Sequence, residues 1–169
     1  MTRRAQTPTP VGVRPDALRA AIAVREVRRA TGTPRFRDSV FGELNVLDIG
    51  QHDALEVIVS LDGARMSEVA QALRVDPSTA TRAVARLETL GLVQRRADPA
   101  DGRSVVAVGT TEGVSLLERL RERGRDALGR LYDRFDEDEL SQLADLLERL
   151  VAGVDELAEE LQRPGRHDG

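Results

Sequence analysis

The segment that most restricts the fold is residues 65–109, in which two short helical patterns and two strand patterns follow one another closely. It reads RMSEVAQALRVDPSTATRAVARLETLGLVQRRADPADGRSVVAVG. In the first helical pattern Ser67 is a suitable N-cap. The buried side of this helix is expected to consist of Val69, Ala70 and Leu73. Only residues 74–76 (Arg-Val-Asp) separate it from the next helix, and a turn of that length is typical of a helix-turn-helix unit.

The second helix has clear start and stop signals and is expected to span residues 77–90. Asp76 is a good N-cap, and Pro77 suits the first helical position because its missing N–H would be unpaired there anyway. Gly91 can end the helix, since glycine adopts a positive φ without a Cβ penalty. At 3.6 residues per turn, one face is apolar and consists of Ala80, Val84, Leu87 and Leu90.

The opposite face of this helix is small, hydroxylated and basic. It consists of Ser78, Arg82, Ala85 and Thr89, flanked by Thr79, Thr81 and Arg86. A solvated helix face ordinarily mixes Glu with Lys or Arg, whereas the only acid of this helix is Glu88, near its end. Such a face can lie close in a DNA major groove, with arginine available for guanine and hydroxyls for phosphates.

Two strand patterns follow, over residues 92–96 and 104–109, and the second is rich in valine. The turn dipeptides Asp98-Pro99 and Asp101-Gly102 lie between them. The arginines around the tip of this hairpin are Arg95, Arg96 and Arg103. A basic tip suits insertion into or across a minor groove. Helix, turn, helix and basic hairpin, in this order, predict a winged helix-turn-helix that binds double-stranded DNA.

The segment resembles the DNA-binding core of the MarR family of transcriptional regulators. The residues that carry the resemblance are DPSTATRAVARLETLGLVQRR, then DPADGRS, then Thr111, Glu112 and Gly113. Order and spacing agree over residues 47–150. The resemblance implies that Asp101 and Arg103 of the wing place an arginine for DNA contact. It also implies a dimer interface built by the first and last helices, and a pocket for a small, often aromatic or anionic, effector.

Two helical patterns, over residues 15–30 and 35–44, precede this core. Before them, residues 1–14 are rich in Thr, Pro and Arg and are expected to be disordered. The alternative is a basic arm in which Arg3 and Arg4 touch DNA.

Further capping signals place helices on both sides of the core. Asp48 and Gln51 form a capping-box pattern at the start of one helix. Its apolar face consists of Ala54, Leu55, Ile58 and Leu61. After the wing, Thr111 is expected to cap a helix that continues to residue 134.

The final helix, which Asp136 and Glu139 begin with a second capping-box pattern, has the clearest periodicity of the chain. Its apolar stripe consists of Leu140, Leu143, Leu147, Leu150, Val154, Leu157 and Leu161, and it is widened by Leu146 and Val151. Steps of three and four residues over three heptads are typical of helices that pack against one another along their length. Packing within one chain is the alternative, but so small a domain has little core left to cover this face. We therefore expect the first six stripe residues to form a homodimer interface.

Charge is unevenly distributed along the 169 residues, whose formal net charge is −4. Residues 1–110 contain 16 Arg and 13 acidic residues, and residues 111–169 contain 9 Arg and 16 acidic residues. The positive excess lies in the part that carries the predicted helix-turn-helix and wing, where a phosphate-facing surface needs it. Because this excess is modest, we expect tight binding to need a dimer.

Other classes of function lack support in the sequence. The absence of Cys excludes disulfides and thiol redox switches. No apolar run approaches the ~20 residues that span a bilayer, and no signal-peptide pattern follows the start, so a cytoplasmic location without a membrane partner is expected. The two histidines, His52 and His167, belong to no metal-ligand cluster, and no catalytic constellation or phosphate loop is evident. We therefore expect no cofactor, no metal and no enzymatic activity.

The effector pocket that the resemblance implies has few stacking groups available. The aromatic residues are Phe36, Phe41, Tyr132 and Phe135. Phe36 and Phe41 lie near the inferred pocket, as does His52, and these three are the candidate ligand contacts. Each has a role in the core as its alternative.

These patterns predict a mainly α-helical fold with a small β-hairpin wing, in which long terminal helices form a dimerisation region. The expected divisions begin with a disordered tail (1–14) and N-terminal helices that contribute to dimerisation (15–46). The winged helix-turn-helix domain (47–109) follows. C-terminal dimerisation helices (110–162) and a frayed tail (163–169) complete the chain.

The expected function is that of a homodimeric regulator of transcription, specifically a ligand-responsive repressor acting on a pseudo-palindromic operator. The first alternative is a winged-helix protein-interaction module that does not bind DNA. It requires acidic or apolar residues on the exposed helix face, and Arg82, Arg86 and Arg103 argue against it. The second alternative is a small enzyme.

Overall fold

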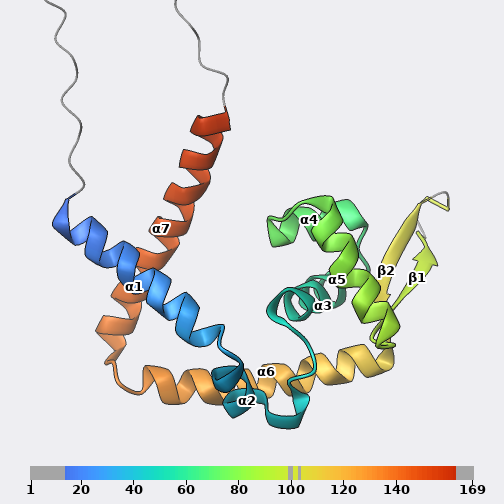
Figure 1. Cartoon of the computed structure of the whole chain (residues 1–169), viewed down its shortest axis with the longest axis horizontal. Coiled ribbons are helices and arrows are strands. Elements are labelled where there is room, and N and C mark those ends of the chain that lie inside the picture. The colour runs from blue at the N-terminus through green and yellow to red at the C-terminus, as the bar shows by residue number, and fades with distance from the viewer. Residues whose placement is uncertain (1–13, 99–100, 103, 163–169) are drawn as a thin grey trace, which may run out of the picture. The chain divides into compact units, whose positions relative to one another are not determined.

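The computed structural model describes residues 14–98, 101–102 and 104–162, which form a mainly helical fold with one antiparallel hairpin (Figure 1). The predicted fold class is confirmed. In chain order the elements are α1 (Pro15–Thr31), α2 (Pro34–Phe41), the 3-10 turn η1 (Gly42–Leu44), α3 (Ile49–Ser60), α4 (Met66–Leu73), α5 (Pro77–Thr89), β1 (Val93–Ala97), β2 (Val105–Gly109), α6 (Thr111–Tyr132) and α7 (Glu137–Gln162).

The chain divides into two compact units, Met1–Arg123 and Gly124–Gly169. The first contains one hydrophobic core, formed by α3, α4, α5, the hairpin and the first turns of α6. Its largest fully buried side chains are Leu55, Ile58, Val69, Val84, Leu87 and Leu117. Full burial of such a side chain stabilises the fold by roughly 1.5–3 kcal/mol before entropy costs. Helix α5 and the hairpin lie side by side and pack on this common core (Figure 1).

Helix α5 begins where the sequence predicts and ends one residue earlier, at Thr89, because Leu90, predicted on its apolar face, is the C-cap and is 37% exposed. The Asp76 carboxylate accepts the Thr79 backbone N–H at 2.9 Å. Gly91 has φ +72°, and its N–H donates to the Glu88 carbonyl at 2.9 Å while the Leu92 N–H donates to the Leu87 carbonyl at 3.0 Å. This pair of bonds is a Schellman closure, which satisfies the last carbonyls of the helix.

Two predicted caps are wrong by one or two residues. The N-cap of α4 is Arg65 rather than Ser67, because the Glu68 side chain accepts the Arg65 N–H at 2.7 Å and starts the helix earlier. The hydroxyl at the start of α6 belongs to Thr110 rather than Thr111, since its Oγ1 accepts the Gly113 N–H at 3.1 Å. The capping box of Asp48 and Gln51 is confirmed.

The hairpin pairs Val93 with Gly109 and Ala97 with Val105. The first strand was predicted one residue too early, because Leu92 uses its N–H to close α5. Ser104 is likewise outside the second strand, since its N–H donates to the Asp101 carbonyl at 2.8 Å.

Two more expectations need correction in the first unit. The helix predicted over residues 35–44 ends at Phe41, because Gly42 takes φ +54° and the chain continues as η1. Leu61, predicted on the apolar face of α3, is the C-cap and is 53% exposed.

In the second unit, Asp136 and Glu139 form the predicted capping box, with each backbone N–H donating to the other residue's carboxylate. None of the residues of α7, all of which the structure describes, is buried. Within the described ranges, no helix has the length and apolar composition needed to traverse a bilayer. Arg3, Arg4 and the tail at 163–169 lie outside the described residues.

Candidate nucleic-acid interface

The two faces of α5 differ sharply in exposure. Ala80, Val84 and Leu87 are completely buried, and they fix the helix on the core. The exposed residues of the other face are Ser78, Thr81, Arg82, Ala85, Arg86 and Thr89, and Thr79 is half-buried. A rigid helix therefore presents two arginines and several hydroxyls to solvent.

A network of side-chain hydrogen bonds organises the first turn of α5. The Asp76 carboxylate accepts the Ser78 hydroxyl at 2.5 Å and the Thr79 hydroxyl at 2.6 Å, besides the Thr79 N–H. These hydrogen bonds hold the pKa of Asp76 far below its ordinary value, and the bond from the Ser78 hydroxyl has the largest effect. The ionised Asp76 therefore contributes stability that is fully present above the ordinary carboxyl pKa and is lost as the pH falls from that value through the depressed pKa.

The arginines of α5 differ in their partners. Arg82 donates from Nη2 to the Thr79 hydroxyl oxygen at 3.1 Å, which orients its guanidinium along the exposed face. Arg86 lies one turn further along the same face and is exposed. Their spacing gives the helix two cationic donor groups on one line.

The hairpin arginines have different surroundings from one another. Arg95 pairs with Glu88 of α5 through Nε at 3.0 Å, so it ties the strand to the helix. Arg96 is exposed and lies opposite Val106 in the register. Arg103 lies outside the described residues, so the expected orientation of Arg103 by Asp101 does too. The Asp101 carboxylate accepts the Ser104 hydroxyl at 2.7 Å.

One ion pair of this region has no signal in the sequence. Arg65, at the start of α4, donates to Asp98 Oδ2 from Nε at 2.9 Å and from Nη2 at 2.5 Å. Asp98, at the base of the wing, is only 9% exposed and donates its N–H to the Ser104 carbonyl. The hydrogen bond and the charge of Asp98 raise the pKa of Arg65. The two residues are 33 positions apart, so no local pattern relates them.

We expect Arg65→Ala to weaken binding of specific and random DNA alike by several-fold, because the wing loses its charged tie to α4. Arg65→Lys should restore only part of the affinity, since an ammonium group is a point donor without the planar fork of a guanidinium. Fluorescence anisotropy titrations over a range of salt concentrations measure both effects. Arg29→Ala, which removes an exposed arginine of α1, is the matched control. Unchanged affinity of Arg65→Ala would exclude this role of the ion pair.

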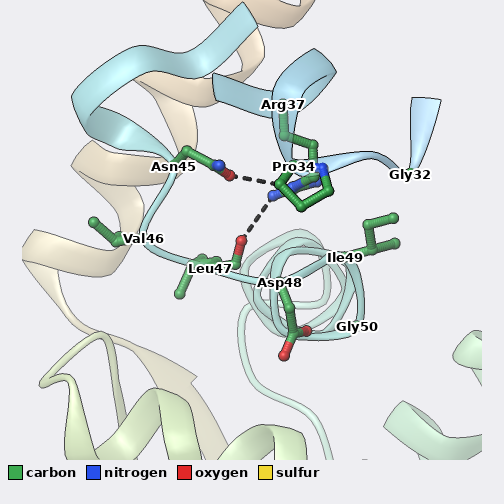
Figure 2. Close-up of a pocket in the computed structure, with 9 residues that line it drawn as sticks. All are labelled: Gly32, Pro34, Arg37, Asn45, Val46, Leu47, Asp48, Ile49 and Gly50. Carbon is green, nitrogen blue, oxygen red and sulfur yellow. Dashed lines mark hydrogen bonds between the residues drawn. The ribbon is translucent and has the colours of Figure 1, made fainter. Parts of the chain in front are cut away.

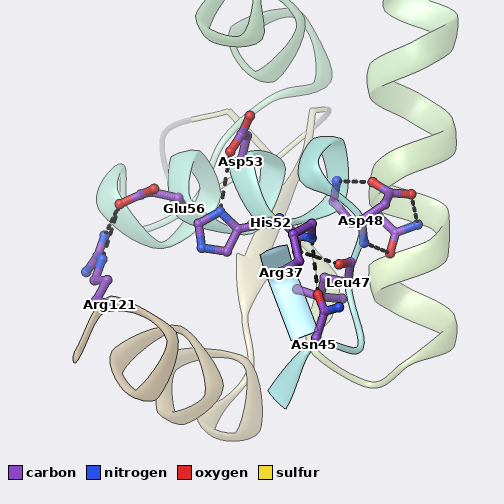
Figure 3. A network of polar contacts seen from close by, with 9 residues as sticks. Arg37, Asn45, Leu47, Asp48, His52, Asp53, Glu56 and Arg121 are labelled. Atoms are coloured by element: carbon purple, nitrogen blue, oxygen red, sulfur yellow. Dashed lines mark hydrogen bonds and ion pairs between the residues drawn. The ribbon is translucent and has the colours of Figure 1, made fainter. Parts of the chain in front are cut away.

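The candidate ligand contacts are only partly brought together. Phe41 and His52 have ring centroids 6.2 Å apart, and the Arg37 guanidinium lies 5.3 Å from the Phe41 ring centre. Among the described residues, Phe36 makes no ring contact with either of them. Figure 3 shows His52 beside Asp53, whose carboxylate lies 3.3 Å from the imidazole Nδ1.

Arg37 also fixes the loop between η1 and α3. It donates to the Asn45 side-chain oxygen at 3.1 Å and to the Leu47 carbonyl at 2.7 Å (Figure 3). A groove of about 600 Å³ lies beside these bonds (Figure 2). It is lined by Gly32, Pro34, Arg37, Asn45, Val46, Leu47, Asp48, Ile49 and Gly50. None of the three predicted ligand contacts lines it.

Proteins of similar sequence are HTH-type transcriptional regulators. Residues 44–104 match the model of the MarR family. The chain is 30% identical over 87 residues to the uncharacterised HTH-type transcriptional regulator YxaD of Bacillus subtilis, covering 52% of this chain and 61% of that protein. It is 28% identical over 139 residues to the regulator Mb0904 of Mycobacterium bovis, covering 80% of this chain and 94% of the relative.

Solved structures share the fold. A MarR family regulator has a TM-score of 0.74 at 22% identity, covering 86% of this chain and 94% of its own. A structure described as a probable transcriptional regulator from Pseudomonas aeruginosa has a TM-score of 0.66 at 25% identity, covering 77% of this chain and 95% of its own. A variant of MarR from E. coli complexed with operator DNA has a TM-score of 0.69 at 24% identity, covering 80% and 95%.

Proposed function

We propose that this chain, a member of the MarR family of winged helix-turn-helix regulators, binds double-stranded DNA at specific sites and represses transcription there. The observation that carries the proposal is the exposed face of α5. A helix fixed on its buried side by Ala80, Val84 and Leu87 presents Arg82 and Arg86 with hydroxyls and small side chains. These residues suit an α-helix in a major groove, where arginine recognises guanine.

The proposed DNA contacts come from two elements, helix α5 and the hairpin. Ser78, Thr79, Thr81, Arg82 and Arg86 face the major groove from α5. The hairpin lies along the adjacent backbone and minor groove with Arg95, Arg96, Asp101 and Arg103. The ion pair of Arg95 with Glu88 makes that arginine a link between strand and helix as well as a charge for phosphate. A protein-interaction module without DNA binding is not favoured by this basic face.

The active form is a homodimer built on the terminal helices. The apolar stripe of α7 is largely exposed within one chain, with Leu147 at 44%, Leu150 at 46% and Val154 at 55%. Leu140, Leu143 and Leu157 extend it toward both ends. A contiguous apolar face of this length is a candidate for protein contact. Two copies on a two-fold axis meet half-sites ~34–36 Å apart, so the operator is a pseudo-palindrome.

The proposed regulator acts in the cytoplasm and has no enzymatic activity. It responds to a small effector that binds near Phe41 and His52. The close rings, with the Arg37 cation beside them, offer stacking and a charge for an aromatic or anionic molecule. Phe36 lies on the same helix α2 and is 40% exposed, but within the described residues it makes no ring contact with Phe41 or His52, so it is not among the groups that hold the effector.

Arg82→Ala tests base reading. Arg82 is central on the exposed face, so the variant should lose about 1–3 kcal/mol at the specific operator and lose base preference at one position of each half-site. Mobility shifts on the region upstream of the protein's own gene, beside random DNA, measure the difference. Arg119→Ala, an exposed arginine of α6, is the control for loss of charge. Equal weakening on both DNAs would mean that Arg82 contacts only phosphate.

A further inference from the structure

The hydroxyls of α5 all donate their protons to acceptors within the same helix or its N-cap. The Ser78 and Thr79 hydroxyls lie 2.5 and 2.6 Å from the Asp76 carboxylate oxygens. The Thr81 hydroxyl lies 2.7 Å from the Pro77 carbonyl, and that of Thr89 lies 2.9 Å from the Ala85 carbonyl. Ionised carboxylates and carbonyls only accept hydrogen bonds, and a hydroxyl has one proton. The direction of each bond is therefore fixed, with the hydroxyl as the donor.

Two of these four hydroxyls lie in the first turn of α5, the end of a recognition helix that meets base edges. Thr81 and Thr89 are bonded back to their own helix backbone, whereas Ser78 and Thr79 are held at its first turn. A hydroxyl oxygen has two acceptor positions. Thr79 uses one for the Arg82 guanidinium, and within the described residues no donor occupies those of the exposed Ser78. The first turn of α5 thus offers a pair of acceptors beside Arg82.

Because the major groove distinguishes donors from acceptors, this polarity selects bases. Adenine N6 and cytosine N4 carry amino donors there, whereas guanine and thymine present acceptor oxygens. We propose that Ser78 and Thr79 recognise the amino group of adenine or cytosine next to the guanine contacted by Arg82, with Asp76 as the positioning residue that fixes their polarity. This inference rests on the proposed entry of α5 into a major groove.

This proposal differs from the expectation that these hydroxyls donate to phosphates. A phosphate oxygen is an acceptor, and the protons it would need are already bonded to Asp76. The ionised Asp76 also repels phosphate at close range. Phosphate contacts therefore come from the arginines, while the first turn of α5 contributes discrimination between bases.

Asp76→Asn is the decisive variant, because the two side chains have the same shape and both are good N-caps. The Asn oxygen takes the place of Oδ1 and still accepts the Thr79 N–H and the Ser78 hydroxyl, but its amide nitrogen donates in place of Oδ2, so the Thr79 hydroxyl proton becomes available to DNA. We expect the variant to fold, and to accept thymine or guanine at the position where the wild type selects adenine or cytosine. Selection of binding sites from randomised duplexes measures this change for both proteins.

Glu68→Gln is the matched control, since it also removes one negative charge at a helix start and keeps an accepting oxygen. It should raise affinity for all sequences without changing base preference. Purine in place of adenine, or a cytosine analogue lacking the amino group, should weaken wild-type binding by about fivefold or more, and Ser78→Ala should reduce that difference because it removes one of the two acceptors.

The outcomes separate the two proposals. Failure of the wild type to prefer any sequence would overturn DNA recognition by α5 itself. Sequence-specific binding in which Asp76→Asn and Ser78→Ala keep the wild-type preference, or in which the amino-free analogues bind equally well, would overturn only the acceptor assignment. If Asp76→Asn unfolds, as judged by circular dichroism, the analogues with wild-type protein and Ser78→Ala give the decision alone.

Discussion

Leu147→Asp together with Leu150→Asp should give a folded monomer that no longer binds its operator detectably, although neither residue contacts DNA. The two leucines lie in the middle of the apolar stripe of α7, and they are 44% and 46% exposed in one chain. A carboxylate at either position would have to be buried without a partner in a dimer, which is strongly unfavourable. In a monomer it remains in water at little cost.

The expected loss of dimer stability is large because many apolar side chains of the stripe are affected. Burying each leucine or valine of the stripe is worth roughly 1.5–3 kcal/mol before entropy costs, and the dimer loses this contribution along the helix. Operator binding is lost together with the dimer, because a single α5 reads only one half-site and the basic excess of the DNA-binding part of one chain is small.

Sedimentation velocity at micromolar concentration, beside a binding titration on the same samples, checks both parts of this prediction. Ala152→Asp is the control, since residue 152 projects opposite the stripe at 100° per residue and is exposed. It introduces the same charge and should remain a dimer with full affinity. A wild-type monomer at this concentration, or a monomeric variant with full operator affinity, would refute the homodimer.

The sequence predicted the elements whose signals are local. Asp76, Pro77 and Gly91 define α5 because capping and positive φ depend on the residue itself and its near neighbours. The buried face of α5 follows from the helical repeat in the same way. Local signals also explain the errors: both Ser67 and Thr111 are good caps, and only the bonds of Glu68 and Thr110 decide against them.

What the sequence could not provide depends on contacts between distant segments. The Arg65–Asp98 ion pair joins α4 to the wing, and the Glu88–Arg95 pair joins α5 to β1. No sequence separation predicts either ion pair, because only tertiary packing brings its two residues together. The direction of the Ser78 hydroxyl is likewise invisible in a sequence, since serine can donate or accept.

Gly113→Ala should destabilise the fold severely, by about 3 kcal/mol or more, as forced overpacking against backbone does. Gly113 is buried in the first turn of α6, where a Cβ would lie 2.0 Å from the Leu92 carbonyl oxygen and 2.9 Å from its carbon. That oxygen already accepts the Thr110 N–H at 3.0 Å, and Leu92 closes the Schellman motif of α5. The backbone therefore cannot yield without disturbing the end of the proposed recognition helix.

Intrinsic helix preference acts in the opposite direction, so the sign of the result is informative. Alanine favours a helix interior over glycine by about 1 kcal/mol, which is smaller than the cost of the overlap. Gly124→Ala, on the same helix but with nothing within 4 Å of its added Cβ, should be stabilising by up to that amount. Urea unfolding followed by circular dichroism, at one fixed protein concentration because a dimer's stability depends on it, measures both variants. Equal stabilisation by the two substitutions would mean that α6 does not approach Leu92 this closely.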